Sequence, residues 1–212
     1  GAAFVEFDPT KHIVTPFQIP VHWERVKGVD YGYAAESCCL WGAIDINDGT
    51  LIIYRELYQK GLTGEELGSI IGNMELEDPF SVPGVLDTAA WARTGTTGPT
   101  VGEALIKAGH KLRRADKNRI QGKIQIHEFL KVKENGRPRL QIFNSCPNLI
   151  RELQSIPLSK TNPEDVDTHA SDHAYDALRY LIMSRPRVDS PLERIRGLKR
   201  EMHQPADSTF GY

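Results

Sequence analysis

One stretch, VKGVDYGY at residues 26–33, places a carboxylate inside an apolar run. Val29 leads directly into Asp30, Gly32 lies just beyond, and a second apolar run follows over residues 38–46. The pattern is typical of a buried strand that ends in an acid at a tight bend. Because burying a carboxylate is costly unless it is paired or bound to a metal, Asp30 predicts that partner groups meet it at the end of this strand.

Composition allows one substantial hydrophobic core. The chain has 212 residues, 40% of them hydrophobic, so one domain with peripheral tails is expected. With 26 Lys and Arg against 28 Asp and Glu, the total charge neither favours nor excludes nucleic acid. Three cysteines without zinc-site spacing indicate a reducing compartment. No signal peptide and no apolar run of ~20 residues are found, so we expect a soluble, intracellular protein with no membrane segment.

The first half of the chain predicts an antiparallel meander followed by α/β crossovers. Strands are expected over residues 26–33, 37–46 and 51–57, with a turn at Asn47-Asp48-Gly49. Thr63 and Glu66 form the capping pattern of a helix start. A short strand within residues 82–90 then ends in Asp87, and the loop 91–100, a helix over 101–108 and a strand over 111–114 complete a crossover.

The second half is expected to be mainly helical. Helices are predicted over residues 118–132, 147–156 and 169–184, and Asn135-Gly136 predicts a hairpin that pairs residues 131–132 with 140–143. Residues 157–168 are expected to be a loop. The predicted organisation is a linker or surface arm over residues 1–20, a domain over 21–186 and a tail over 187–212 that contains a short basic helix at 192–202.

Acidic side chains gather on the predicted last helix. On a helical wheel, His169, Asp172, His173 and Asp176 share one face. A solvated helix face is the simplest explanation, but Asp30 and Asp87 each follow an apolar strand and would meet this helix at one end of a sheet. Such carboxylates repel one another unless a divalent cation neutralises them, and oxygen ligands favour Mg²⁺ or Mn²⁺. The spacing of the two histidines leaves a zinc site as a minor alternative, without the Glu of HExxH.

Positive charge is concentrated in the middle of the chain. Such a concentration of cations is consistent with an ordinary solvated surface and with a surface that binds the phosphate backbone of a nucleic acid. The acidic site nearby favours the phosphate-binding surface. Its cations, set against the single acid Asp116, are Lys107, Lys111, Arg113, Arg114, Lys117, Arg119 and Lys123, continued by Lys131, Lys133, Arg137 and Arg139.

Three motifs together resemble a known family. The order GVDYG, VLDTAA and HAYDALRYLIM is similar to the nuclease domain of the large terminase subunit of tailed bacteriophages, in the RNase H-like superfamily. The resemblance covers residues 20–185. Its most specific part is the late helix, with His173, Asp176, Ala177, Arg179 and Tyr180.

The resemblance implies a fold and a site. The fold is an RNase H-like mixed α/β sheet, three antiparallel strands and then parallel strands, flanked by helices. Asp30, Asp87 and Asp176 become a metal-binding triad, with His173 as an auxiliary ligand or proton-transfer group, and Asp172 offers another acid beside them. We hypothesise that Asp30 bridges two ions ~4 Å apart, with Asp87 on one and Asp176 on the other.

The implied activity is a Mg²⁺- or Mn²⁺-dependent endonuclease that cuts double-stranded DNA concatemers during viral genome packaging, in the cytoplasm of the infected bacterium. The implied partners are the terminase ATPase domain, whose GxxxxGK[ST] loop is absent from this sequence, the small terminase subunit and the portal, which the tail would face. Alternatives are another RNase H-like nuclease such as a resolvase or transposase, an actin-like or sugar-kinase-like ATPase, and a non-catalytic DNA-docking module.

Overall fold

The computed structural model describes residues 1–95 and 97–185, so the expected tail and its basic helix lie outside the described residues. A seven-stranded sheet with the order β1-β7-β4-β3-β2-β5-β6 forms the centre of the fold. Its middle is the predicted antiparallel meander, β2 (Glu24–Asp30), β3 (Glu36–Ile44) and β4 (Leu51–Lys60). The turn before β4 contains Gly49 with φ 76°, a conformation that favours glycine.

Parallel strands extend the meander on both sides. β5 (Gly84–Leu86) pairs with β2 and β6 (Leu112–Arg114) pairs with β5, while β7 (Leu140–Phe143) pairs with β4 and β1 (Ile13–Val14) pairs with β7. The predicted fold class, a mixed sheet of antiparallel and parallel strands flanked by helices, is confirmed.

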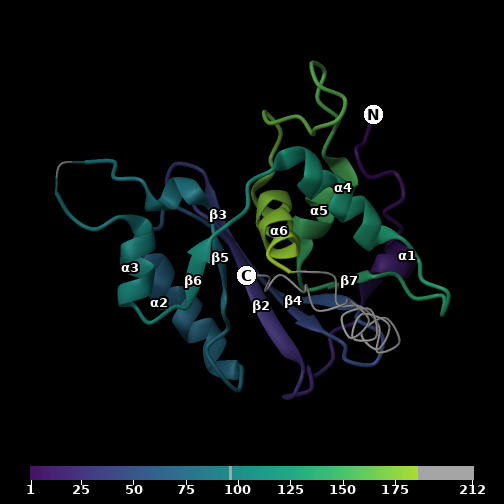
Figure 1. The fold of residues 1–212 in the computed structure, drawn as a ribbon, viewed down its shortest axis with the longest axis horizontal. Helices are drawn as coiled ribbons and strands as arrows, with labels where there is room; N and C mark the ends of the chain where they lie inside the picture. Colours follow the sequence, from purple (N-terminus) through teal and green to yellow (C-terminus); the bar gives the residue numbers. More distant parts are fainter. Residues whose placement is uncertain (96, 186–212) are drawn as a thin grey trace, which may run out of the picture.

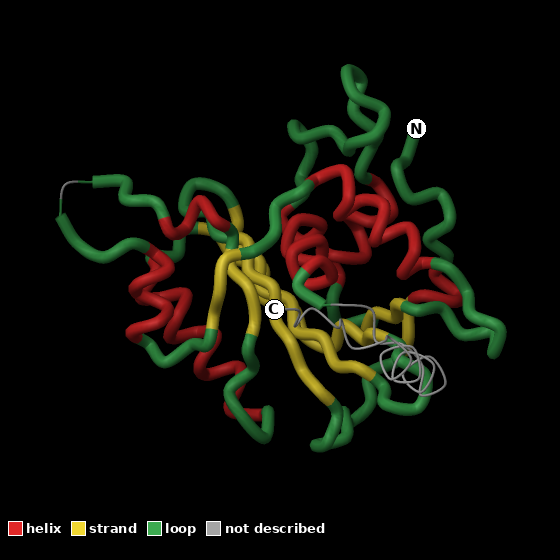
Figure 2. Tube along the Cα trace, in the orientation of Figure 1, coloured by secondary structure: helices red, strands yellow, loops and turns green. Residues whose placement is uncertain are grey.

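Helices cover both faces of the sheet (Figures 1 and 2). One layer contains α2 (Gly64–Met74) and α3 (Val101–Lys107), with the short 3₁₀ helices η1 (Glu75–Glu77) and η2 (Thr88–Trp91) nearby. The other contains α4 (Arg119–Leu130), α5 (Pro147–Ser155) and α6 (His173–Met183). As predicted, Thr63 caps α2 by accepting a hydrogen bond from the backbone N–H of Glu66.

The contact between β2 and α6 places the strand end beside the helix. A Cβ on Gly28 would clash with the carbonyl oxygen of Ala177, so only glycine lets α6 approach this closely. Side chains alternate along a strand, so Asp30 shares the α6 face with Gly28. Lys27 faces the opposite layer, where its Nζ contacts Glu75 (2.5 Å).

Two sequence predictions about the second half were wrong. The Asn135-Gly136 turn closes one antiparallel bridge, Val132 to Pro138, with backbone bonds from Lys133 to Arg137 (2.9 Å) and from Arg139 to Lys131 (3.1 Å), but residues 131–132 do not pair with 140–143. The apolar β7 instead pairs parallel with β4. The last helix begins at His173 rather than at residue 169, since the Asp167 carboxylate accepts the backbone N–H of His169 (2.9 Å) in a local turn.

The N-terminal residues contribute to the core. Phe4 and Phe7 are buried in it, α1 (Pro9–His12) follows, and β1 joins the sheet edge. This packing differs from the expected surface arm, because the two phenylalanines are hidden from solvent. Among the described residues, no helix has the length and apolar character needed to cross a membrane.

Candidate active site

Acidic side chains from three elements meet at one end of the sheet. Asp30 ends β2, and Asp87 directly follows the parallel neighbour β5, with its backbone N–H donating to the carbonyl of Val29 (3.0 Å). Asp176 lies in the first turn of α6, which packs on β2. Burial, with the charges of Asp176 and Asp87, raises the pKa of Asp30 to about 6, although a hydrogen bond with His173 opposes this.

His173 lies between two carboxylates at the start of α6. Its Nδ1 is 3.3 Å from Asp30 Oδ2 and its Nε2 is 3.5 Å from Glu36 Oε2. The hydrogen bond with Asp30 raises the pKa of His173 to about 8, so the imidazolium form is favoured. Sequence reasoning missed Glu36, which is the first residue of β3 and carried no distinguishing signal.

Asp172 and His169 precede α6 rather than lying on its face. Burial and the neighbouring charge of Asp176 raise the pKa of Asp172 to about 7, so this carboxyl belongs to the same negative environment. His169 contacts Asp167 (3.1 Å), and 94% of its side chain is exposed. The helical arrangement of His169 and His173 behind the minor zinc alternative is therefore not formed.

Two arginines contact Asp176. Arg179 Nη2 donates to Asp176 Oδ1 (3.0 Å), and Arg119 Nη1, from the start of α4, lies 3.7 Å from the same oxygen. Arg119 Nε also donates to Asp165 Oδ2 (2.8 Å) in the loop before α6. Burial raises the pKa of Asp176, while both arginines oppose the shift. The role of Asp165 gave no sequence signal, since residues 157–168 showed only loop composition.

The N-terminus of α6 is held by a buried glutamate from α5. Glu152 Oε1 accepts the backbone N–H groups of Ala174 (2.9 Å) and Tyr175 (3.0 Å), and Tyr58 donates to its Oε2 (2.8 Å). Only 1% of Glu152 is exposed. A carboxylate at a helix N-terminus satisfies free N–H groups and complements the helix dipole. Glu152 therefore fixes the turn that carries His173 and Asp176.

The donor chemistry of this site fits a divalent cation. Asp30, Asp87 and Asp176 supply hard oxygen donors, and the charges of Asp87 and Asp176 raise the pKa of Asp30, so a cation would relieve their repulsion. Within residues 1–95 and 97–185, however, no three His, Cys, Asp or Glu side chains already converge as a ligand set. The carboxylates are gathered by the fold but not preassembled around one point.

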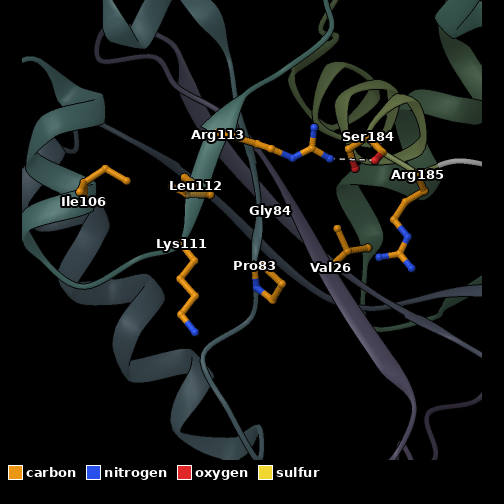
Figure 3. A pocket seen from close by; sticks show the side chains of 9 residues that line it. All are labelled: Val26, Pro83, Gly84, Ile106, Lys111, Leu112, Arg113, Ser184 and Arg185. Atoms are coloured by element: carbon orange, nitrogen blue, oxygen red, sulfur yellow. Dashed lines mark hydrogen bonds between the residues drawn. The ribbon is translucent and has the colours of Figure 1, made fainter.

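Several of the predicted basic residues line the β6 side of the molecule. Lys107, Lys111, Arg113, Arg114 and Lys117 are exposed. Figure 3 shows Lys111 and Arg113 at a cavity of about 410 Å³, where Arg113 donates to the carbonyl of Ser184 (2.9 Å). Arg114 is paired with Leu86 in the register and stacks over Trp91 (5.4 Å), so it lies at the strand end next to Asp87.

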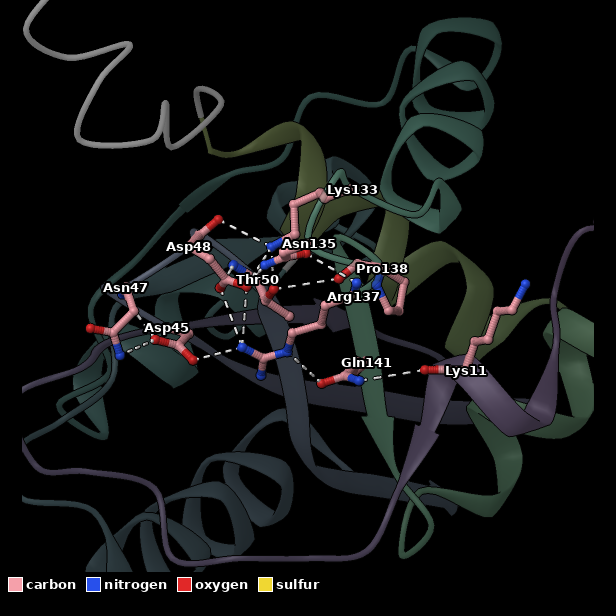
Figure 4. Close-up of polar contacts among 10 residues, drawn as sticks. All are labelled: Lys11, Asp45, Asn47, Asp48, Thr50, Lys133, Asn135, Arg137, Pro138 and Gln141. Atoms are coloured by element: carbon pink, nitrogen blue, oxygen red, sulfur yellow. Dashed lines mark hydrogen bonds and ion pairs between the residues drawn. The ribbon is translucent and has the colours of Figure 1, made fainter.

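Lys123 lies on α4 with its Nζ 3.3 Å from His127 Nε2. The later basic residues lie elsewhere. Arg137 Nη1 contacts Asp45 (2.8 Å), and Lys133 contacts Asp48 (2.8 Å), around the β3–β4 turn (Figure 4). That turn is at the opposite end of β3 from the partner of Asp30, roughly 20 Å along the strand. Arg139 follows Arg137 towards β7, and its backbone carbonyl accepts from Leu51. The structure thus divides the residues of the predicted phosphate-binding surface into two separate groups.

Comparison with known proteins identifies solved structures of similar fold but no relative by sequence. No family model and no curated protein matches the sequence. Among solved structures, the P22 large terminase nuclease domain aligns with a TM-score of 0.72 at 15% identity, covering 91% of this chain and 96% of that one. The large terminase of the thermophilic bacteriophage D6E aligns with a TM-score of 0.72 at 17% identity and 87% coverage, and this chain spans 45% of its length.

A third neighbour was solved with a metal. The nuclease domain of the large terminase g2p from bacteriophage SPP1, with bound Mn, gives a TM-score of 0.51 at 15% identity over 74% of this chain and 84% of that one. The chain therefore has the fold of the nuclease domain of phage large terminases, as the sequence motifs predicted.

Proposed function

We propose that this chain is a divalent-metal-dependent endonuclease that cuts double-stranded DNA during phage genome packaging. The observation that carries the proposal is the meeting of Asp30, Asp87 and Asp176 at one end of a sheet whose fold is shared with terminase nuclease domains. This supports a nuclease over an ATPase or a passive DNA-docking module, since the acids come from three separate elements and would repel one another without a cation.

Each acidic residue has a role in this proposal. Asp30, Asp87 and Asp176 would hold two Mg²⁺ or Mn²⁺ ions, with Asp172 as a further acid beside Asp176. Bound metal would supply a nucleophilic water at neutral pH and stabilise the departing 3′ oxygen. His173 orients the Asp30 carboxylate and holds a proton at Nδ1 between them.

The substrate contacts in this proposal are phosphates. The exposed group Lys107, Lys111, Arg113, Arg114 and Lys117 leads along β6 towards Asp87, with Arg119 and Lys123 on α4 beyond it. Lysine and arginine contacts to phosphates position a duplex without reading its sequence. We therefore propose little base specificity. Arg137 and Arg139 are left out of this group because they lie with the β3–β4 turn at the other end of the sheet.

The biological setting follows as part of the proposal. The D6E neighbour is a large terminase of which this chain spans less than half. We propose that residues 21–186, together with the N-terminal residues that pack in the same core, form the nuclease domain, working beside a packaging ATPase domain, the small terminase subunit and the portal in the cytoplasm of the infected bacterium.

The test is cleavage of supercoiled plasmid in Mn²⁺ by the wild-type chain and Asp30→Asn. We expect the variant to lose cutting and to keep its fold by circular dichroism, because asparagine keeps the shape but not the charge. Asp8→Asn, at the N-cap of α1 where asparagine is equally suitable, is the matched control and should cut normally. Cutting by Asp30→Asn at the wild-type rate would overturn the proposal, as would a wild-type chain that binds plasmid without cutting it.

A further inference from the structure

Arg119 stands between two carboxylates from different segments of the chain. Its Nε donates to Asp165 Oδ2 at 2.8 Å, and its Nη1 is 3.7 Å from Asp176 Oδ1. Asp165 belongs to the loop 157–168, which projects from the helical layer in Figure 1, whereas Asp176 belongs to α6. The shorter distance shows that the loop carboxylate holds Arg119 more closely than Asp176 does.

The two arginines around Asp176 have more N–H donors than the neighbouring acceptors bind. Arg179, whose side chain is 2% exposed, bonds Asp176 through Nη2 alone. Its Nε and Nη1, and Nη2 of Arg119, are buried and find no acceptor within the described part of the chain. Buried donors without acceptors are costly, so these guanidinium groups have N–H donors left to bond the Asp176 carboxylate between them.

The packing of α4 against α6 keeps Arg179 in place. A Cβ on Gly122 of α4 would clash with the stem of Arg179, so glycine leaves the groove in which that side chain lies. Arg119 is one turn earlier on the same helix and is 30% exposed, so it is the more movable of the two arginines. Arg179 is thus a fixed partner of Asp176 and Arg119 an adjustable one.

We propose that Arg119 is a positioning residue that competes with metal for the Asp176 carboxylate, and that Asp165 weakens this competition by holding Arg119 towards the loop. The inference rests on the proposed function, because it assumes that Asp176 is a metal ligand. It adds a regulatory element to that function: a displacement of the loop 157–168 releases Arg119 to Asp176 and lowers the affinity for metal.

The experiment compares two variants that delete the same 2.8 Å ion pair, Arg119→Gln and Asp165→Asn. Mn²⁺ binding to the full chain without DNA is measured by isothermal titration calorimetry. Arg119→Gln removes the competitor and should bind Mn²⁺ more tightly, while Asp165→Asn frees the competitor and should bind it more weakly. We expect each shift in the dissociation constant to be roughly tenfold, the lower end of effects from groups that orient metal ligands.

A merely structural ion pair gives a different result, because its loss shifts both variants in the same direction. Such a shared shift, or no shift in either variant, overturns the inference and leaves the proposed function intact. A wild-type chain that binds no Mn²⁺ overturns both. Arg119→Lys keeps the charge and should restore near wild-type affinity.

Lys133→Gln and Asp48→Asn are charge-matched controls, because each deletes an ion pair of the same length at the far end of the sheet; Asp48→Asn also removes the 3.3 Å contact with Arg137. Neither should change Mn²⁺ affinity. Melting temperatures without metal identify any variant whose fold is damaged, and Arg119→Met, which also removes the charge and should bind Mn²⁺ more tightly, then replaces Arg119→Gln.

Discussion

Replacing Glu152 with alanine should destabilise the chain more than most single substitutions. The Glu152 carboxylate accepts the N–H groups of Ala174 and Tyr175, the first free donors of α6, and it is almost completely buried. Alanine leaves both N–H groups without an acceptor in a site that admits little water. At about 1–3 kcal/mol for each unsatisfied buried group, with a smaller loss at the partly exposed Tyr58 hydroxyl, the free energy of unfolding should fall by about 3–5 kcal/mol.

Glu152→Gln separates the hydrogen bonds from the charge. The amide oxygen of glutamine can still accept both N–H groups, so the variant loses the hydrogen bond that Tyr58 donates to Oε2 and the interaction of a negative charge with the helix N-terminus, the latter up to about 2 kcal/mol when partly buried. The order of stability should therefore be wild type, glutamine, alanine. Glu164→Ala, in the exposed part of the loop, is a matched control and should change stability by less than about 0.5 kcal/mol.

Urea unfolding followed by tryptophan fluorescence measures these differences, provided that the dependence on urea is unchanged between variants. An alanine variant within about 1 kcal/mol of wild type would refute the capping role. If Glu152→Gln is as stable as wild type and Glu152→Ala is not, the loss of stability comes from the hydrogen bonds to the two N–H groups alone. Because α6 carries His173 and Asp176, the alanine variant should also bind Mn²⁺ more weakly.

Two further predictions concern other parts of the molecule. Burial lowers the pKa of His110, whose Nδ1 accepts from Lys27 and whose Nε2 donates to the carbonyl of Gly68. Because the pKa of an unfolded histidine is about 6.5, the free energy of unfolding should fall as pH drops from about 7.5 through 6.5. This pH dependence should be shallower in His110→Gln. Equal pH slopes in the two proteins would contradict it. Replacing Arg114 and Lys117 with alanine should weaken DNA binding equally for unrelated sequences and reduce the salt dependence of log affinity by about one for each phosphate that the variant no longer neutralises. Arg137→Ala, which lies with the β3–β4 turn, should leave that salt dependence unchanged, and a decrease as large as that of the double variant would return Arg137 to the DNA-binding group.

The positions of Asp30 and Asp87 were predictable because the signal is local. Each acid follows an apolar run in sequence. The antiparallel meander makes β4 run in the same direction as β2, and the crossover through α2 makes β5 parallel to both, so the ends of β2 and β5 meet at one edge. The start of α6 was not predictable, because its capping group is Glu152, about twenty residues earlier and on another helix. A local reading instead extended the periodic pattern back to residue 169, where the Asp167 turn interrupts it.

The positions of the basic residues also could not be predicted from local sequence. Cations that are nearly continuous in sequence from Lys107 to Arg139 separate in space, because Arg114 at the end of β6 and Arg119 at the start of α4 lie at the acidic end, while the segment after α4 runs to the β3–β4 turn. Charge density along the chain therefore grouped some cations that the fold keeps on one side of the molecule, and it added Arg137 to them only by sequence proximity. Strand direction, which a charge count does not contain, decides the division.

Gly122 connects these observations. In sequence it is a weakness in an otherwise regular helix, since glycine lowers helix stability by about 1 kcal/mol relative to alanine. In the structure the aliphatic part of the Arg179 side chain packs against α4 at Gly122, and Arg119 lies one turn earlier on α4. The spacing of Arg119 and Gly122 thus lets α4 supply one arginine to Asp176 and leave room for the second, Arg179, which comes from α6 itself. An alanine at 122 would strengthen α4 as an isolated helix and yet push it away from the carboxylate that the two arginines share.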